Sequence, residues 1–424
     1  MTGRERTKVL VVGQGYVGLP LAMRSVEVGH DVVGYEVDES RVKRLQAAES
    51  YVEDVPSEVL AAALLTGRYV PTAETEACAG FDVAVITVPT PLHEGTPDLS
   101  YIEAAATALA RHLRRGATVI LESTTYPGTT EELVAPLLED GSGLVAGDDF
   151  HLGYSPERID PGNRDWKLTN TPKVVSGIDE ASLEAVQAFY DSIVDRTVPV
   201  SGCMEAELTK LLENTFRHVN IALVNELAMF AGDLGIDVWE AIDAASTKPF
   251  GFMRFTPGPG VGGHCLPIDP SYLSWRVRRA LGQPFRFVEL ANDVNDHMPD
   301  YVVRRLVVAL NRRRQCVNGS RVLLLGLAYK RNTGDDRESP AVVVAERLLA
   351  LGAEVRVADP HVRQDHVHGP VMRVDVSEEE LSSADAVILL TDHDAFDLEA
   401  VRTHARYVLD TRRRLPPGER VEYL

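Results

Sequence analysis

The feature that most constrains the fold is a glycine-rich turn between a short apolar run and a stretch with helical spacing. Residues 9–12 (VLVV) are continuously apolar, as expected of a fully buried parallel strand. Residues 16–28 have helical spacing, and the turn that joins the two, GQGYVG at residues 13–18, fits the pattern G-x-G-x-x-G. A strand, such a turn and a helix in this order predict the first βαβ unit of a doubly wound sheet.

Each glycine of this turn has its own role if the turn binds a dinucleotide. Gly13 permits the tight turn, Gly15 lets a pyrophosphate approach the backbone, and Gly18 lets the helix pack closely on the strand. Glu36 ends the second expected strand, 23 residues after Gly13, where a carboxylate accepts hydrogen bonds from the ribose hydroxyls. An acid at this place favours NAD because it would repel the 2′-phosphate of NADP, although Arg41 nearby leaves NADP open.

The pattern of strands and helices gives way to a long helical segment and then restarts. Residues 206–234 contain no proline and place apolar residues close to helical period, which predicts a helix of about eight turns. The expected strands of the first half, after the one at 9–12, are residues 32–35, 83–88 and 118–121, with a helix at 101–112. Those of the second half are residues 321–325, 354–358 and 386–390, with a helix at 339–351. The order predicts an α/β fold with two Rossmann-like doubly wound domains joined by a long central helix.

Charge and composition argue against several classes of protein. The 424 residues carry 43 Lys+Arg and 63 Asp+Glu, a formal net charge of −20, which disfavours nonspecific binding to nucleic acid and to anionic lipid. No apolar stretch approaches the ~18 residues of a membrane helix, and no signal-peptide pattern precedes the first strand. The four cysteines are far apart and form no C-x-x-C pair, so zinc-finger and disulfide-stapled folds are not expected. We therefore expect a cytoplasmic protein that binds neither nucleic acid nor membranes.

Four residues in the middle of the chain carry candidate chemistry. Cys265 lies between glycines and a proline in GVGGHCLPID, where a thiol can act as a nucleophile if it is activated, although these surroundings alone favour a structural cysteine. Lys210 and Asn214 are four residues apart and project from one face of the expected long helix. Glu157 follows the end of an expected strand, where the ligand sites of such sheets lie. No metal is predicted, because no tight ligand spacing is found among His361, Asp365, His366 and His368.

Seven segments that occur in order from residue 9 to about 340 resemble one known family. They are VVGQGYVGLP, VPTPL, ESTTYPGTT, YSPERIDPG, LTKLLENTFRHVNIALVNE, GPGVGGHCLPIDP and GLAYKRNTGDDRES. Together they are similar to the NAD-dependent nucleotide-sugar 6-dehydrogenases, the UDP-glucose/GDP-mannose dehydrogenase family. The resemblance implies an NAD-binding Rossmann-like domain at residues 1–200, a central helical and dimerisation domain with the catalytic loop at 201–300, and a C-terminal UDP-binding Rossmann-like domain at 301–424. It also implies a homodimer formed through the central helix.

The family reaction oxidises the C6 primary alcohol of a nucleotide sugar to a carboxylate and consumes two NAD⁺ and one water. By resemblance, Cys265 is the nucleophile. Its thiolate adds to the intermediate aldehyde, the thiohemiacetal gives up the second hydride, and water hydrolyses the resulting thioester. The resemblance thus reverses the interpretation of Cys265 that its surroundings alone favour.

The resemblance also assigns the remaining catalytic roles. Lys210 and Asn214 stabilise the oxyanion that develops at the reacting carbon. Asp269 assists proton transfer, Glu157 takes part in thioester hydrolysis, and Thr125 positions the catalytic water.

Two further sets of contacts follow from the same resemblance. The expected NAD contacts are Gly13, Gly15, Tyr16, Val17, Gly18, Glu36, Arg41, Thr90 and Glu122. The expected contacts with the nucleotide sugar are Glu157, Arg158, Lys210, Asn214, Phe255, Gly262, Lys330 and Arg337, of which the last two face the diphosphate.

The segments YSPERIDPGN, STKPFGF and GGHCLPIDP look most like the branch of the family that oxidises UDP-N-acetylhexosamines. Pro161 stands where the UDP-glucose and GDP-mannose branches carry a second acid. The expected substrate is therefore UDP-N-acetylglucosamine or UDP-N-acetylmannosamine, with UDP-glucose or TDP-glucose as the alternative. An ordinary two-electron dehydrogenase and a catalytically silent NAD-binding regulator are the competing hypotheses.

Overall fold

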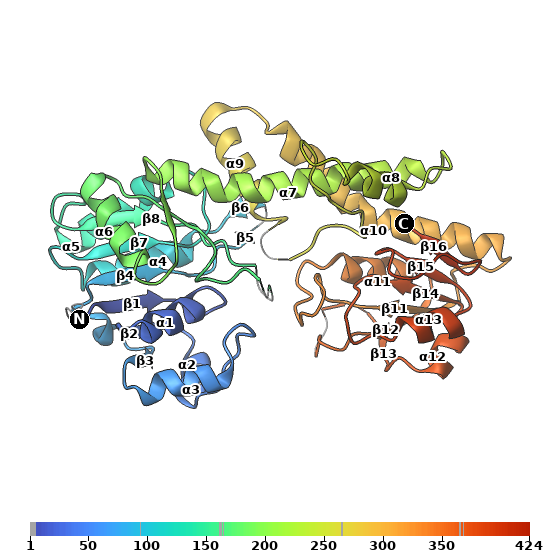
Figure 1. Cartoon of the computed structure of the whole chain (residues 1–424), viewed down its shortest axis with the longest axis horizontal. Coiled ribbons are helices and arrows are strands. Elements are labelled where there is room, and N and C mark those ends of the chain that lie inside the picture. The colour runs from blue at the N-terminus through green and yellow to red at the C-terminus, as the bar shows by residue number, and fades with distance from the viewer. Residues whose placement is uncertain are drawn as a thin grey trace. The chain divides into compact units, whose positions relative to one another are not determined.

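The computed structural model describes residues 6–93, 95–160, 163, 165–263, 266–363, 366–367 and 369–424. The chain divides into two compact units (Figure 1). The first unit contains residues 1–213 and 271–282, and the second contains residues 214–270 and 283–424. The segment predicted as a central domain contributes to both units, and the boundaries of the three predicted domains stay a prediction.

The first unit is built on a parallel sheet with strand order β3-β2-β1-β4-β7-β8. Its strands are β1 (Lys8–Val12), β2 (Asp31–Tyr35), β3 (Tyr69–Thr72), β4 (Val83–Ile86), β7 (Thr118–Leu121) and β8 (His151–Tyr154). The chain starts in the centre at β1, winds outward to β3 and then returns to continue on the other side at β4. This is the Rossmann order, and its switch point between β1 and β4 is where ligands of such sheets bind.

Helices cover both faces of this sheet, which explains why its strands are continuously apolar. The helices are α1 (Gly18–Glu27), α2 (Glu39–Gln46), α3 (Ser57–Leu65), α4 (Ser100–Ala110), α5 (Ala135–Ser142) and α6 (Glu180–Tyr190). The minor elements are β5 (Leu92–His93), β6 (Thr96–Pro97), β9 (Lys173–Val175), β10 (Thr197–Pro199) and the short helices η1 (Thr75–Cys78) and η2 (Thr130–Val134). On one face α1, α3 and α6 bury their apolar side chains against β1, β2 and β4.

The long central helix predicted from residues 206–234 is confirmed as α7 (Cys203–Ala231). It is 29 residues long, which corresponds to about eight turns. The helix ends three residues earlier than predicted because Gly232 and Gly235 follow it, and Gly235 adopts a left-handed φ of 73°. Within the described residues, no helix combines the length and the apolar character needed to cross a membrane.

The second unit repeats the topology of the first. Its sheet has the order β13-β12-β11-β14-β15-β16, and all its strand pairs are parallel. The strands are β11 (Arg321–Leu325), β12 (Glu354–Ala358), β13 (Met372–Arg373), β14 (Ala386–Leu389), β15 (Val408–Asp410) and β16 (Val421–Tyr423). Its helices are α8 (Val238–Ala245), α10 (Arg286–Arg312), α11 (Pro340–Ala350), α12 (Glu378–Ser383) and α13 (Leu398–His404), whereas most of α9 (Asp269–Leu281) belongs to the first unit.

Alternate residues of β11 point to opposite faces of this second sheet. Val322 and Leu324 pack against α10 and α11, whereas Leu323 and Leu325 pack against α12 and α13. Both faces are therefore buried, as in the first unit. The predicted α/β class with two Rossmann-like domains is confirmed.

The two sheets also share the local geometry at the end of their first strand. The Gly13 N–H donates to the carbonyl of Tyr35 at the end of β2, and the Gly326 N–H donates to that of Ala358 at the end of β12, at 2.8 and 2.9 Å. An acid follows the second strand in each case, Glu36 in the first unit and Asp359 in the second. The buried Asp359 carboxylate is occupied by four backbone N–H groups and by the His393 ring.

Candidate active site

The glycine-rich turn after β1 has the geometry that the sequence predicts. Gly13 has a φ of 92°, and a Cβ atom on it would lie 2.9 Å from the carbonyl oxygen of Thr87. A Cβ on Gly18 would lie only 1.9 Å from the carbonyl oxygen of Gly13. A Cβ on Gly15, by contrast, would meet nothing within 4 Å. Gly13 and Gly18 are thus required by the fold, whereas the space at Gly15 fits the approach of a pyrophosphate.

Glu36 lies directly beside this turn, at the carboxyl end of β2. Its carboxylate accepts one hydrogen bond from the N–H of Gln14 and one from the N–H of Asp38, both at 3.1 Å. Arg41 lies 3.7 Å from both the Glu36 and the Asp38 carboxylates. Two acids therefore pair with Arg41, the cation that left NADP open, and the site fits NAD rather than NADP.

The other predicted NAD contacts differ in their solvent exposure. Tyr16 is 46% exposed beside the turn, and Val17 directly precedes α1. Thr90 is buried, and its carbonyl oxygen accepts a hydrogen bond of 3.0 Å from the hydroxyl of Tyr272.

Glu122 has surroundings that the sequence did not predict. Its side chain has no exposed surface, and its carboxylate forms an ion pair with Lys173 and accepts a 2.6 Å hydrogen bond from the Tyr190 hydroxyl. Burial, together with the neighbouring Glu157, raises the pKa of Glu122 to about 7. The Glu122 carboxylate is thus held by two side chains of the protein, and the predicted contact of Glu122 with NAD stays a prediction. Neither Lys173 nor Tyr190 belongs to a motif, so no sequence pattern pointed to them.

The first half of α7 anchors the loop that follows β8. The Lys210 ammonium is buried and donates a hydrogen bond of 2.6 Å to the carbonyl oxygen of Glu157. One turn further along, the Glu213 carboxylate accepts a hydrogen bond of 2.7 Å from Arg158. The structure therefore brings together the predicted lysine and the predicted Glu157, and it gives Arg158 an ion-pair partner within the protein.

Glu207, one turn before Lys210, anchors the loop that follows β7. It is completely buried and accepts hydrogen bonds from the N–H groups of Gly128 and Thr130 at 2.6 and 2.9 Å. Burial raises the pKa of Glu207 to about 7. One face of α7 thus holds the loops after two neighbouring strands, β7 and β8, through Glu207, Lys210 and Glu213. Sequence reasoning missed Glu207, whose only signal is its spacing of three residues from Lys210.

The predicted role of Thr125 stays a prediction. Thr125 has no exposed surface, and its hydroxyl hydrogen-bonds with that of Thr129. Thr124, one residue earlier, is partly exposed and lies at the same strand end.

In the second unit the structure brings together Asn214 and Asp269. Both side chains are buried, and the Asn214 amide donates a hydrogen bond to the Asp269 carboxylate. Asn214 is one turn after Lys210 in the continuous helix α7, and Asp269 is the first residue of α9. The amide fixes the orientation of a carboxylate that is predicted to handle protons.

The loop before Cys265 packs on the segment that contains Lys330 and Arg337. A Cβ atom on Gly262 would lie 2.6 Å from the carbonyl oxygen of Glu338 and 2.9 Å from Cβ of Tyr329. Only glycine fits this close approach, so Gly262 and the predicted diphosphate segment are neighbours within the second unit. Arg337 forms two hydrogen bonds with Asp335.

Phe255, from the same loop, makes an edge contact with Phe216, with ring centroids 5.7 Å apart.

Several predicted residues lie outside the described residues. They are Cys265, the neighbouring His264, Pro161, Asp365 and His368. The role of Cys265 therefore stays a prediction. His366 pairs with Asp336, and the described residues contain no group of three or more metal-ligating side chains.

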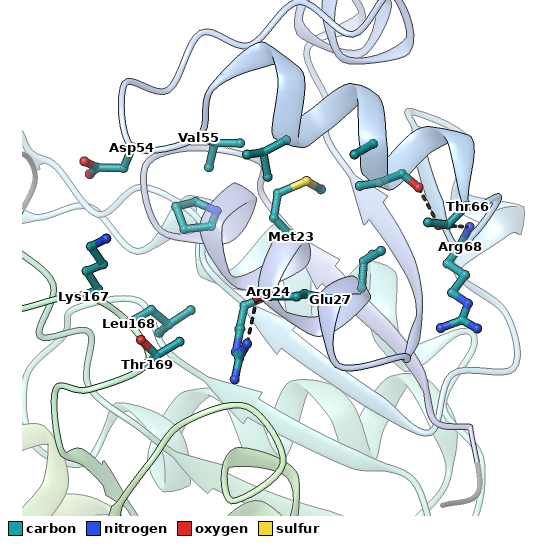
Figure 2. Close-up of a pocket in the computed structure, with 15 residues that line it drawn as sticks. Met23, Arg24, Glu27, Asp54, Val55, Thr66, Arg68, Lys167, Leu168 and Thr169 are labelled. Carbon is teal, nitrogen blue, oxygen red and sulfur yellow. Dashed lines mark hydrogen bonds and ion pairs between the residues drawn. The ribbon is translucent and has the colours of Figure 1, made fainter. Parts of the chain in front are cut away.

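Two of the cavities in the described part of the chain are considered for a ligand. One, of about 710 Å³, lies between α1, α3 and residues 167–169, with Met23 and Val55 among its apolar lining and Arg24 and Arg68 at polar positions (Figure 2). It contains no residue predicted to bind NAD or substrate. The other, of about 580 Å³, is in the second unit and is lined by Trp239, Asp243, Arg254, Thr256, Asp392, Arg412, Arg413 and Arg414. The sequence analysis did not single it out, although the run TRRR after β15 is a signal for clustered positive charge.

Comparison with known proteins extends these observations over the whole chain. Residues 7–194 match the NAD binding domain of the UDP-glucose/GDP-mannose dehydrogenase family, residues 204–297 match its central domain, and residues 323–417 match its UDP binding domain. UDP-N-acetyl-D-mannosamine dehydrogenase of Pyrococcus horikoshii is 38% identical, over 92% of this chain and 90% of its own. UDP-N-acetyl-D-glucosamine 6-dehydrogenase of Pseudomonas aeruginosa is 39% identical, over 92% of this chain and 91% of its own.

A solved structure agrees with these relatives. The UDP-D-ManNAc dehydrogenase from Pyrococcus horikoshii superimposes with a TM-score of 0.89 at 36% identity, covering 98% of both chains. The glycine turn and Glu36 lie in the segment that matches the NAD binding domain, and most of α7 lies in the segment that matches the central domain. The chain is a member of the UDP-glucose/GDP-mannose dehydrogenase family of NAD-dependent nucleotide-sugar oxidoreductases.

Proposed function

We propose that this protein oxidises the C6 hydroxymethyl group of UDP-N-acetylglucosamine or UDP-N-acetylmannosamine to a carboxylate, with two NAD⁺ and one water consumed. The observation that carries the proposal is the buried Lys210 ammonium on the Glu157 carbonyl, which joins two residues that the family reaction needs. The relatives named above, which act on N-acetylated sugars, support the choice of sugar. We further propose that the enzyme works in the cytoplasm.

In the proposed mechanism the residues of this chain add a nucleophile and stabilise charge. NAD⁺, bound at the glycine turn, supplies the hydride acceptor for each of the two oxidations. The Cys265 thiolate attacks the aldehyde carbon, and Lys210 and Asn214 stabilise the charge that develops on its oxygen. After the second oxidation, Glu157 accepts a proton from the water that attacks the thioester, and the thiol leaves.

The proposed reaction predicts two NADH for each sugar consumed. We expect NADH formation with UDP-N-acetylglucosamine or UDP-N-acetylmannosamine, and much less with UDP-glucose, GDP-mannose and TDP-glucose. Absorbance at the NADH band and the mass of the product measure both quantities. One NADH per sugar would instead support an ordinary two-electron dehydrogenase, and no NADH with any sugar would support a silent NAD-binding protein.

Replacing Cys265 with serine is expected to lower formation of the acid by at least about 10³-fold, because a hydroxyl forms no comparable covalent adduct at neutral pH. The carboxylated sugar is measured by mass spectrometry after a fixed time. Formation of the acid at the wild-type rate would show that the covalent mechanism is wrong.

We also propose a homodimer that forms through α7. Large apolar side chains are exposed along this helix, mostly at intervals of three or four residues: Met204, Leu208, Leu212, Phe216, Leu223, Leu227 and Phe230. A continuous exposed apolar stripe of this kind is typical of a protein interface. A second copy of the chain provides a self-complementary stripe for it.

Replacing Leu212 with glutamate is expected to convert the dimer into a monomer, because the charge would be buried in the apolar interface. Light scattering coupled to gel filtration measures the mass of both proteins. The control is Leu65→Glu on α3, where the leucine is also exposed but lies outside the stripe, and this variant is expected to stay a dimer. If the Leu212→Glu protein were still a dimer, the interface would have to lie elsewhere on the protein.

A further inference from the structure

Four polar side chains meet in the interior of the first unit, next to the loop that carries Glu157. Glu122 follows β7, Glu157 follows β8, Lys173 begins β9 and Tyr190 ends α6. The side chains of Glu122, Lys173 and Glu157 are 0%, 4% and 10% exposed. Charged groups are rarely buried to this degree unless they are paired.

A single ammonium group serves both carboxylates of this cluster. Lys173 Nζ forms an ion pair with Glu122 Oε1 and lies 3.6 Å from Glu157 Oε2. The Tyr190 hydroxyl donates to the second oxygen of Glu122, and Lys173 Nζ lies 5.2 Å from the centroid of the Tyr190 ring. The second oxygen of Glu157 accepts the N–H of Ile159. Both carboxylates that contact the Lys173 ammonium are therefore held by a further hydrogen bond, Glu122 by the Tyr190 hydroxyl and Glu157 by the N–H of Ile159.

The charges of the cluster favour an ionised Glu157. Burial works against ionisation, but Lys173, the hydrogen bond from Glu122 and the N–H of Ile159 together hold the pKa of Glu157 below its ordinary value. The two carboxylates also raise the pKa of Lys173 despite its burial. Lys210 is a second lysine near Glu157, and it donates to the Glu157 carbonyl. Burial and the neighbouring Glu157 raise the pKa of Glu122, so the two carboxyl groups of the cluster are shifted in opposite directions.

We propose that Lys173 is a positioning residue for Glu157, held in place by Glu122 and Tyr190, so that Glu157 meets the thioester as an oriented carboxylate. The inference rests on the proposed function, in which Glu157 takes the proton of the attacking water. It also gives Glu122 a role that explains its complete burial.

Replacing Lys173 with methionine tests this role, because methionine fills similar space without charge. An opposite charge at this distance lowers a carboxyl pKa by about 1–3 units, so its loss raises the pKa of Glu157. A base works only when it is ionised, and activity is therefore lost as the pH falls through that pKa. In a plot of kcat against pH, we expect the acid limb to move to higher pH by at least about one unit. We expect little change in KM for the sugar.

Two further variants separate positioning from folding. In Glu122→Gln the amide oxygen can still accept from the Tyr190 hydroxyl, and the Lys173 ammonium remains beside Glu157, so the acid limb is expected not to move to higher pH. If Lys173→Met is unstable because it leaves buried carboxylates without a cation, the double variant Glu122→Gln/Lys173→Met removes one of them and recovers stability. It should still show the shifted acid limb.

A folded Lys173→Met protein, or the folded double variant, with the acid limb of the wild type would overturn the inference. The stoichiometry of the wild type is measured in the same experiment. Two NADH per sugar with an unmoved limb would mean that the positioning role alone is wrong, whereas no NADH from the wild type would mean that the proposed function has failed first.

Discussion

Replacing Gly18 with alanine is expected to destabilise the first unit by at least about 3 kcal/mol, because the new Cβ would lie 1.9 Å from the Gly13 carbonyl oxygen. Neither partner can retreat, since Gly18 begins α1 and Gly13 is bonded to the end of β2. Each kcal/mol corresponds to roughly 2–4 °C in Tm for a unit of this size. Thermal unfolding followed by circular dichroism measures the loss.

The matched control is Gly15→Ala in the same turn. Its Cβ would meet no atom within 4 Å, so Tm in the absence of NAD is expected to stay within about 2 °C of the wild type. The methyl group would instead occupy the space reserved for the pyrophosphate, and the Kd for NAD is expected to rise at least about tenfold, or ~1.4 kcal/mol. Equal loss of stability in both variants would contradict the separate roles assigned to the two glycines.

Replacing Lys210 with methionine is expected to lower kcat by about 10²–10³-fold, the cost of removing one donor to a developing oxyanion. The variant also loses the 2.6 Å hydrogen bond to the Glu157 carbonyl. Steady-state NADH formation at saturating substrate measures the effect. Because methionine keeps most of the buried apolar stem, we expect Tm to change far less than in Gly18→Ala.

Lys43→Met provides the control for a lysine outside the site. The Lys43 side chain is 75% exposed and pairs only with Glu39 on the surface of α2. Exposed pairs of this kind contribute little to stability, so activity and Tm are expected to stay at wild-type levels. A Lys210→Met enzyme with wild-type kcat would remove Lys210 from the proposed mechanism.

The elements of this fold were predictable where burial on both faces makes a strand continuously apolar. The strands at residues 321–325 and 354–358 were predicted with their observed bounds, and α7 was displaced by only three residues at each end. The glycine turn was predictable for a related reason. Its three glycines meet separate steric requirements, and each requirement favours glycine at its own position in the sequence.

The surroundings of individual polar side chains were not predictable in this way. Which of Thr124 and Thr125 faces the interior depends on the direction of the chain as it leaves β7, and the motif does not encode it. Glu122 and Lys173 are 51 residues apart in the sequence, and their pairing exists only because β7 and β9 reach the same part of the unit. Glu207 likewise acquires its role from the loop that folds over α7.

The full occupancy of Asp359 has a consequence for how many nicotinamide cofactors one chain can hold. In the first unit Glu36 accepts only two backbone N–H groups, so its carboxylate retains lone pairs for a ribose. Asp359, at the matching position of the second sheet, has five donors and no exposed surface. A reaction with two oxidations must then use one cofactor crevice twice. In the proposed mechanism the half-oxidised sugar would then stay bound to Cys265 while NADH is exchanged for a second NAD⁺.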